Sequence, residues 1–188
     1  MVKQVATLSA LRLRELGYWK SSSTGHSSIL NEPIVKDYIP TVTDYCAQTT
    51  FYDRKFAISF PSREEWNENN VIYNSHLGIF TDGSKIDNKV GGGVFSEELK
   101  TQKSFRIPDY CSVYYAEVVA IQEALTILKG EHPGTHNIDI FSDSQAAIKS
   151  LGSTTFNSKI AISCRRSLNE MAEQFNINLI WVPGPRNS

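Results

Sequence analysis

The sequence predicts an α/β domain built on a mixed sheet, in which three antiparallel strands are followed by two parallel ones. Three runs typical of strands, separated by short polar turns, predict an antiparallel meander. Two further apolar runs each follow a helical pattern, and strands joined by a helix lie parallel with a right-handed crossover. The predicted strands are residues 76–81, 90–96, 101–107, 136–142 and 177–182, and the predicted helices are residues 112–129, 146–151 and 158–175.

Length and charge limit the architecture and the partners of the chain. With 188 residues, it can form one well-buried domain with an appendage but hardly two full domains. Its 40% hydrophobic and 21% charged residues are typical of soluble globular proteins. Because the net charge is −1, any binding of nucleic acid must rest on local patches or on metal ions rather than on overall attraction.

The sequence carries no signal for a membrane or for export. No apolar run approaches the roughly 20 residues that span a bilayer, and the first residues lack the apolar core of a secretory signal. The cysteines, Cys46, Cys111 and Cys164, are too widely spaced to suggest a disulfide framework or a zinc site with paired ligands. Free thiols fit a reducing compartment, so we expect an intracellular protein with no membrane partner.

The first part of the chain has weaker patterns, and we expect a domain boundary near residue 72. Residues 1–71 are predicted to contain one short helix, at residues 4–16, and an otherwise irregular linker. The polar stretch at residues 62–70 predicts a linker or an exposed helical turn. Residues 72–188 are predicted to form the α/β domain.

Asp82 follows the first predicted strand and is the first candidate site residue. We expect the strand to end at Asp82, with Gly83 turning the chain. A carboxylate held at a strand end, beside a small residue, can approach a metal ion or a phosphate closely. Asp-Gly is also a common turn dipeptide, so taken alone it indicates a turn more often than a site.

Three consecutive glycines, at residues 91–93, lie inside the second predicted strand. Glycine inside a strand costs stability, so we expect either a bulge or a close approach by a neighbouring side chain or ligand. Packing of a helix against this strand is the alternative.

Glu117 is the second candidate, because it lies on the apolar stripe of the helix at residues 112–129. It shares that stripe with Ile121, Ala124 and Leu128. An ionised carboxylate that faces a core is costly unless it is paired or bound to a metal. The alternative is a first-turn glutamate that the helix dipole favours and that leans toward solvent.

Asp143 comes directly after the strand at residues 136–142 and is the third candidate. An alternative role is structural: Ser142 and Gln145 have the spacing of a capping box, and Asp143 would favour the helix dipole. The next helix, at residues 158–175, has one apolar stripe with Arg165 to one side of it.

The predicted topology brings the three acids together. Asp82 and Asp143 end strands that run side by side in the same direction, and the helix between them starts near the same edge with Glu117. Such close carboxylates repel one another, and divalent cations are the usual remedy. Ligand oxygens favour Mg²⁺ or Mn²⁺ over zinc. Convergent carboxylates that hold two metal ions are one recognised arrangement for phosphodiester cleavage.

Four motifs follow one another at the ends of the predicted elements: Thr81-Asp-Gly-Ser84, Ala116-Glu117, Ser142-Asp-Ser-Gln145 and Trp181-Val-Pro-Gly184. In this order they resemble the ribonuclease H family over residues 76–184. The details Gly91-Gly-Gly-Val and Asp143-Ser-Gln-Ala-Ala resemble in particular the ribonuclease H domains at the end of non-LTR retrotransposon polyproteins. Residues 6–17 and 25–26 are similar to the stretch between reverse transcriptase and ribonuclease H in such elements.

The resemblance implies an endonuclease that hydrolyses the RNA strand of RNA–DNA hybrids and leaves 5′-phosphate and 3′-hydroxyl ends. It implies two Mg²⁺ or Mn²⁺ ions, both bridged by Asp82, with Glu117 and Asp143 completing one of the two sites. It also implies a monomer or a part of a larger polyprotein. The residues that it places beside the nucleic acid are Gly83, Ser84, Ser144 and Gln145.

The sequence departs from the family pattern after the last strand. Pro185 stands where the family has a flexible histidine, and the expected last helix with its fourth carboxylate is missing. We therefore expect one metal site to be weakened. Two functions stay open at this point, an impaired nuclease and a catalytically inactive nucleic-acid-binding fragment, besides a purely structural role of the three acids as a turn and helix caps.

Overall fold

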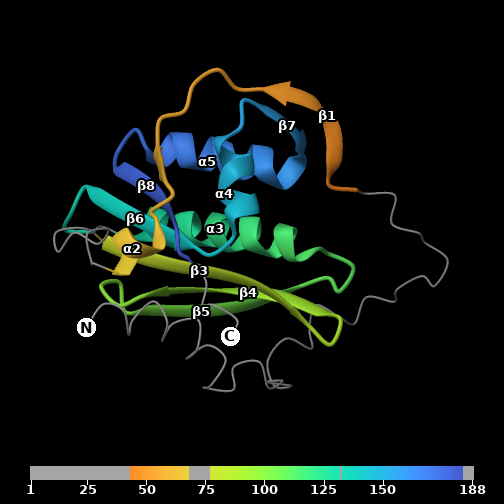
Figure 1. Ribbon diagram of the computed structural model, residues 1–188, viewed down its shortest axis with the longest axis horizontal. Helices are drawn as coiled ribbons and strands as arrows, with labels where there is room; N and C mark the ends of the chain where they lie inside the picture. Colours follow the sequence, from red (N-terminus) through yellow and green to blue (C-terminus); the bar gives the residue numbers. More distant parts are fainter. Residues whose placement is uncertain (1–42, 68–76, 132, 184–188) are drawn as a thin grey trace.

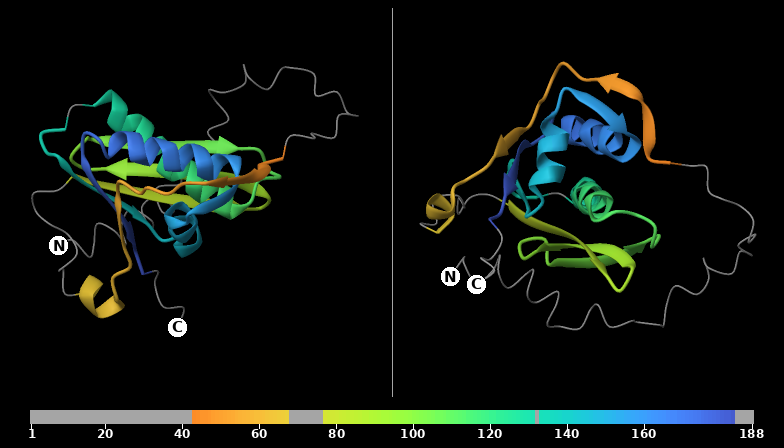
Figure 2. Two further views of the ribbon diagram at one scale, coloured as in Figure 1. Left: turned by 90° about the horizontal axis from the view of Figure 1, so that it is seen from above. Right: turned by 45° about the vertical axis from the view of Figure 1, so that its right-hand side comes forward.

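The computed structural model describes residues 43–67, 77–131 and 133–183, which form one main sheet with the three longest helices on one face (Figure 1). Helix α3 lies between the sheet and α5, and α4 packs beside them (Figures 1 and 2). No helix within these ranges is long and apolar enough to cross a membrane. The elements are β1 (Tyr45–Thr50), β2 (Ala57–Ser59), α2 (Arg63–Asn67), β3 (Leu77–Ile86), β4 (Lys89–Ser96), β5 (Thr101–Ile107), α3 (Val113–Gly130), β6 (Asn137–Ser142), α4 (Gln145–Gly152), β7 (Thr155–Ser158), α5 (Lys159–Met171) and β8 (Asn176–Trp181).

The main sheet has the strand order β2-β8-β6-β3-β4-β5. Strands β3, β4 and β5 pair antiparallel, whereas β6 and β8 continue the sheet parallel to β3. The predicted mixed sheet of three antiparallel and two parallel strands, flanked by helices, is therefore confirmed. The structure adds β2 as a sixth strand, parallel to β8 at the edge of the sheet. A domain boundary near residue 72 stays a prediction, and it separates β2 in sequence from the strands beside which β2 lies.

Strand β3 is longer than predicted, so the prediction that it ends at Asp82 is wrong. Its pairing with β4 continues without interruption from Phe80 opposite Phe95 to Ile86 opposite Lys89. The chain turns at Asp87 and Asn88 instead, both with positive φ (49° and 62°). Asp and Asn tolerate this conformation, which two-residue hairpin turns require.

The glycines of β4 form no bulge, because both of its registers are continuous. They accommodate a close approach by the neighbouring strand: a Cβ added at Gly92 would lie 2.6 Å from the ring of Phe105 and 2.8 Å from the carbonyl oxygen of Asp82. Real Cβ atoms do not approach other atoms so closely, so a larger residue would displace the Phe105 ring or the β3 backbone.

The helices bury one apolar core against the sheet. It joins the apolar residues of β3, β6 and β8 to those of α3, α4 and α5, with Ile79, Ile121, Ile140, Leu151, Leu168 and Leu179 among the fully buried members. The alternation along β3 explains this: Leu77, Ile79 and Thr81 are buried on the helix side, and the residues between them are half-buried on the other face.

An N-terminal arm, residues 43–59, runs along the outer side of α5 (Figures 1 and 2). Its first strand, β1, pairs antiparallel with β7 in a separate two-stranded sheet. The carboxylate of Asp44 accepts hydrogen bonds from the backbone N–H of Ile160 (2.8 Å) and from the hydroxyl of Ser158, and thus caps the N-terminus of α5. The polar stretch that follows contains the helical turn α2, which confirms the second of the two predictions, a linker or a helical turn. The predicted helix at residues 4–16 lies outside the described residues.

Candidate metal centre

Two of the candidate carboxylates lie where the pairing of β3 and β6 ends. The last paired residues of these parallel strands are Thr81 and Ser142, and Asp82 and Asp143 are the next residue on each. The hydroxyl of Thr81 donates a hydrogen bond to the carbonyl of Phe141 (2.9 Å), which joins the two strands where their pairing ends. Strand β3 then continues beside β4 alone, so the edge next to Asp82 is open to α3.

Gly83 brings α3 onto this edge. A Cβ added at Gly83 would lie 2.5 Å from the backbone nitrogen of Glu117 and 2.8 Å from the carbonyl carbon of Ala116. Both contacts are with helix backbone, which cannot swing aside, so only glycine fits between strand and helix. The backbone N–H of Gly83 also hydrogen-bonds the Glu117 carboxylate. The residue predicted to turn the chain therefore sets the approach of the helix.

The three candidate carboxylates converge. One carboxylate oxygen from each of Asp82, Glu117 and Asp143 lies within 4.8 Å of the others. Asp143 is exposed, Asp82 is half-buried, and Glu117 is only 4% exposed, so the alternative of a solvent-facing Glu117 is wrong. Burial, and after it the charges of Asp143 and Asp82, raise the pKa of Glu117 to about 9, against the opposing effect of the Gly83 hydrogen bond.

The donor set fits a hard divalent cation. All three ligands are carboxylates, which Mg²⁺ and Mn²⁺ prefer, and a cation would relieve the repulsion among them. In addition, Oε2 of Glu117 is buried and has no hydrogen-bond partner in the described part of the chain. A buried carboxylate oxygen without a partner is costly, and a bound cation would remove that cost.

The neighbouring candidates have mostly local roles. Ser144 is the N-cap of α4 and accepts a hydrogen bond from the N–H of Ala147 (3.3 Å), so the predicted capping box of Ser142 and Gln145 is wrong. The amide oxygen of Gln145 accepts a hydrogen bond from Lys149 (3.0 Å). Ser84 follows Gly83 on β3, and its buried hydroxyl has no partner among the described residues.

Trp181 belongs to the surroundings of the site, although its sequence position gave it no individual role. Its indole N–H donates a hydrogen bond to the carbonyl oxygen of Asp143 (3.0 Å). Beside it, the N–H of Val182 donates to the carbonyl of Ser142 (2.9 Å). The tryptophan at the end of the last predicted strand is the one feature of the sequence that points to this contact. Its partner, the carbonyl of Asp143, could not be predicted from it.

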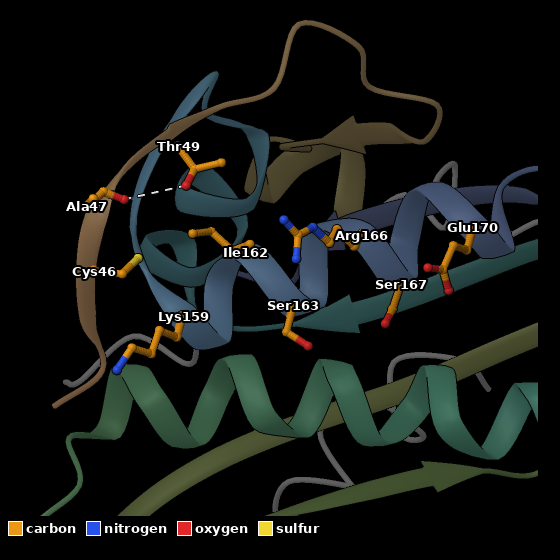
Figure 3. Close-up of a pocket in the computed structure, with 9 residues that line it drawn as sticks. All are labelled: Cys46, Ala47, Thr49, Lys159, Ile162, Ser163, Arg166, Ser167 and Glu170. Carbon is orange, nitrogen blue, oxygen red and sulfur yellow. Dashed lines mark hydrogen bonds between the residues drawn. The ribbon is translucent and has the colours of Figure 1, made fainter. Parts of the chain in front are cut away.

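A separate groove of about 540 Å³ lies between β1 and α5 (Figure 3). None of the three candidate carboxylates lines it. The lining residues are Cys46, Ala47, Thr49, Lys159, Ile162, Ser163, Arg166, Ser167 and Glu170. Two of its polar groups already have partners in the protein, because Lys159 donates to the carbonyl of Thr43 (2.8 Å) and Ser167 accepts from Gln122 (3.1 Å). The groove therefore belongs to the junction between arm and helix.

Comparisons with known proteins give structural likenesses only. No protein-family model and no curated protein matches the sequence. Ribonuclease H1 from the halophilic archaeon Halobacterium salinarum NRC-1 is 23% identical, with a TM-score of 0.43, over 57% of this chain and 86% of that one. The N-terminal ribonuclease H domain of a Mycobacterium tuberculosis protein, solved as a fusion with maltose-binding protein, is 20% identical, with a TM-score of 0.43, over 58% and 88% of the two chains. At these identities and scores, the two structures establish neither the family nor the activity of the chain.

Proposed function

We propose that this chain is a metal-dependent endonuclease that hydrolyses the RNA strand of RNA–DNA hybrids. The observation that carries the proposal is the cluster itself: the carboxylate oxygens of Asp82, Glu117 and Asp143 lie within 4.8 Å of one another. Three acids, two of them where the pairing of β3 and β6 ends and one on a helix, would destabilise the fold without a compensating cation. Their retention in one place is therefore best explained by metal binding.

In the proposed site, the carboxylates of Asp82, Glu117 and Asp143 would hold the divalent ions. Asp82 is central because it lies on β3, which pairs with β6 and contacts α3. A bound divalent ion lowers the pKa of a coordinated water and stabilises charge on phosphoryl oxygens. Burial of Glu117 keeps water away from one side of the cluster, which strengthens the attraction between carboxylate and cation.

The choice of RNA–DNA hybrid rests on the sequence motifs around the acids. Gly83 and Ser84 follow Asp82, and Ser144 and Gln145 follow Asp143, so all four lie beside the cluster in sequence. We propose that they line the path of the hybrid, where hydroxyl and amide groups can recognise a ribose 2′-hydroxyl. The glycine run of β4 and the residues after Asp143 support an origin in a retrotransposon polyprotein. We propose that the chain is either part of such a polyprotein or a monomer.

The test is cleavage of an end-labelled RNA–DNA hybrid by the purified chain, with Mg²⁺ and with Mn²⁺. We expect cleavage in the RNA strand, lowered at least about 100-fold by Asp82→Asn or Glu117→Gln, by analogy with the loss of other groups that stabilise transition-state charge. Asp87→Asn is the matched control, because it removes one negative charge from the same hairpin at a turn residue whose positive φ suits Asn.

Two results would contradict the proposal in different ways. Metal-dependent binding of the hybrid without cleavage would favour the inactive nucleic-acid-binding fragment. Absence of both binding and cleavage, with either metal, would exclude both functions.

A further inference from the structure

We propose that Trp181 is a positioning residue that holds Asp143 in the metal centre through its indole N–H. The proposal rests on the function proposed above. It starts from the place of Asp143: this residue lies one position beyond the last pairing of β6 with β3 and one position before the N-cap of α4. Since Asp143 lies between these two elements, its backbone must be fixed by contacts other than the strand ladder of β3.

The end of β8 supplies such contacts. Trp181 lies opposite Ser142 in the parallel pairing of β8 with β6. Its indole N–H then reaches one residue further and donates to the carbonyl oxygen of Asp143 (3.0 Å). On the other side, the N–H of Ser144 donates to the hydroxyl of Ser142 (3.1 Å). The peptide that follows Asp143 is thus held at its carbonyl and at its nitrogen.

Holding that peptide also holds the side chain. The Asp143 carbonyl is one bond from the Cα, so fixing it restricts ψ of Asp143 and hence the direction of the carboxylate. Asp143 needs this support because the residue is exposed and lies beyond the last pairing of β6 with β3. Without the indole hydrogen bond, the turn can relax away from the other two acids before a cation arrives.

Trp181 is well suited to this role because it is itself fixed. Its ring is half-buried and packs against the main apolar core, at the last residue of β8. The indole has one donor and only two side-chain torsions, so its N–H points in one direction once the ring is packed. Outer contacts of this kind orient metal ligands, and their removal typically weakens metal affinity by about 10- to 100-fold.

The experiment replaces the donor and measures the affinity for Mn²⁺ by calorimetry and by electron paramagnetic resonance. Trp181→Phe keeps an aromatic ring without the N–H, and we expect affinity to fall about tenfold. Cleavage of the hybrid should fall at low Mn²⁺ and recover at saturating Mn²⁺, because the ligands themselves remain. Trp66→Phe is the control for replacing a packed tryptophan. The ring of Trp66, on α2, packs edge-on against the ring of Phe141 on β6, with 5.9 Å between the ring centroids.

A second variant separates the hydrogen bond from the packing of the ring. Incorporation of 3-benzothienylalanine at position 181 replaces the N–H by sulfur and keeps the size and shape of the indole, so it should weaken metal binding even if the phenylalanine variant folds poorly. In the unsubstituted chain, the Trp181 indole N–H should exchange slowly with solvent, and its resonance should shift when metal binds.

The outcomes distinguish this proposal from the proposed function. Metal binding and cleavage that are indifferent to both replacements would overturn the positioning role and leave the nuclease intact. If the unsubstituted chain binds no metal although its indole N–H exchanges slowly, both the nuclease and the positioning role are overturned. Weaker metal binding in both variants, with Trp66→Phe unchanged, supports the positioning role.

Discussion

Glu117 and Arg165 are both buried charged residues on helices, yet their surroundings differ. Arg165 is 2% exposed and Glu117 is 4% exposed. The Arg165 guanidinium donates to the carbonyls of Leu151 (2.6 Å) and Asp53 (2.6 Å) and lies over the ring of Phe56 (4.9 Å). Its Nε alone lacks a partner among the described residues. Glu117 instead has a hydrogen bond from Gly83, an oxygen without a partner, and two like charges nearby.

These surroundings indicate two different uses of a buried charge. Arg165 joins α5, the C-terminal end of α4 and the arm, where two carbonyls accept its hydrogen bonds. The charge of Asp53 partly offsets the repulsion from Arg54. Such an arrangement stabilises the assembly of the chain. Glu117 is held among groups that disfavour its charge, which is expected where a cation is to bind. The predictions below test whether one residue governs stability and the other governs metal binding.

The largest effect on stability is expected from Arg165→Met. The buried carbonyl of Leu151 would lose its donor, and the part-buried carbonyl of Asp53 would keep only the longer hydrogen bond from Asn169 (3.4 Å). The free energy of unfolding should therefore fall by about 2–5 kcal/mol, measured by urea titration. The neighbouring Arg166→Met is the control, because Arg166 is exposed over the ring of Phe51 (5.8 Å). A loss of Mn²⁺ affinity without a loss of stability in Arg165→Met would contradict the division of roles.

Gly83→Ala should affect both properties. The added methyl group would push α3 away from β3, so we expect a loss of about 1–3 kcal/mol in stability from overpacking. Displacement of Glu117 should also weaken Mn²⁺ binding. Gly130→Ala is the matched control, because a Cβ there meets nothing within 4 Å. Unchanged metal affinity in Gly83→Ala would show that the contact between strand and helix does not position Glu117.

Glu117→Gln should stabilise the metal-free protein at neutral and higher pH. The folded-state pKa of about 9 lies above the ordinary glutamate value of 4.5, so between these pH values the folded chain holds a proton that the unfolded chain has released. The free energy of unfolding therefore falls as pH rises through this window, and the glutamine variant should lose that fall. We expect it to be more stable by about 1–3 kcal/mol at pH 8 in the presence of a chelator.

Glu131 provides the control for the Glu117→Gln variant. Glu131→Gln, at the exposed end of the same helix, should leave the pH dependence of urea unfolding unchanged. A Glu117→Gln variant that is less stable than the unsubstituted chain at pH 8 without metal would mean that Glu117 is satisfied by other groups.

The smallest effect is expected at the cap of α5. Asp44→Ala removes the acceptor for the N–H of Ile160, so stability should fall by about 1 kcal/mol. Asp44→Asn keeps an acceptor oxygen and should lose less. Neither variant should change Mn²⁺ affinity, because Asp44 belongs to the junction of the arm and α5. A change in affinity would connect that junction to the metal centre.

The sequence predicted the elements whose pattern is local. The strands and helices of residues 77–181 other than β7 have apolar patterns of their own, and their order implies the parallel pairing that brings Asp82, Glu117 and Asp143 together. Strand β7 was not predicted. Gly83 shows where local statistics failed. Asp-Gly favours a turn, but pairing with β4 keeps β3 extended, and the close approach of α3 is the reason for the glycine.

The arm could not be predicted, for a different physical reason. Strands β1 and β2 are short and have no apolar period, and they are strands only because they pair with β7 and β8, which are more than 100 residues away in sequence. The apolar pattern of α5 predicted that Arg165 lies beside the apolar stripe of the helix. Its burial depends on the arm that covers it, so no pattern within the helix indicates it.

The short strand β2 has a consequence for the solubility of the chain. It occupies the edge of β8, a strand in which Ile177, Leu179 and Ile180 are buried. Unpaired edges of apolar strands pair with strands of other molecules. Strand β2 covers the β8 edge, and because it has three residues and is soon followed by the buried Pro61, it offers little edge for further pairing. A chain shortened to residues 72–188 would leave the β8 edge bare, so we expect it to aggregate where the longer chain stays dispersed.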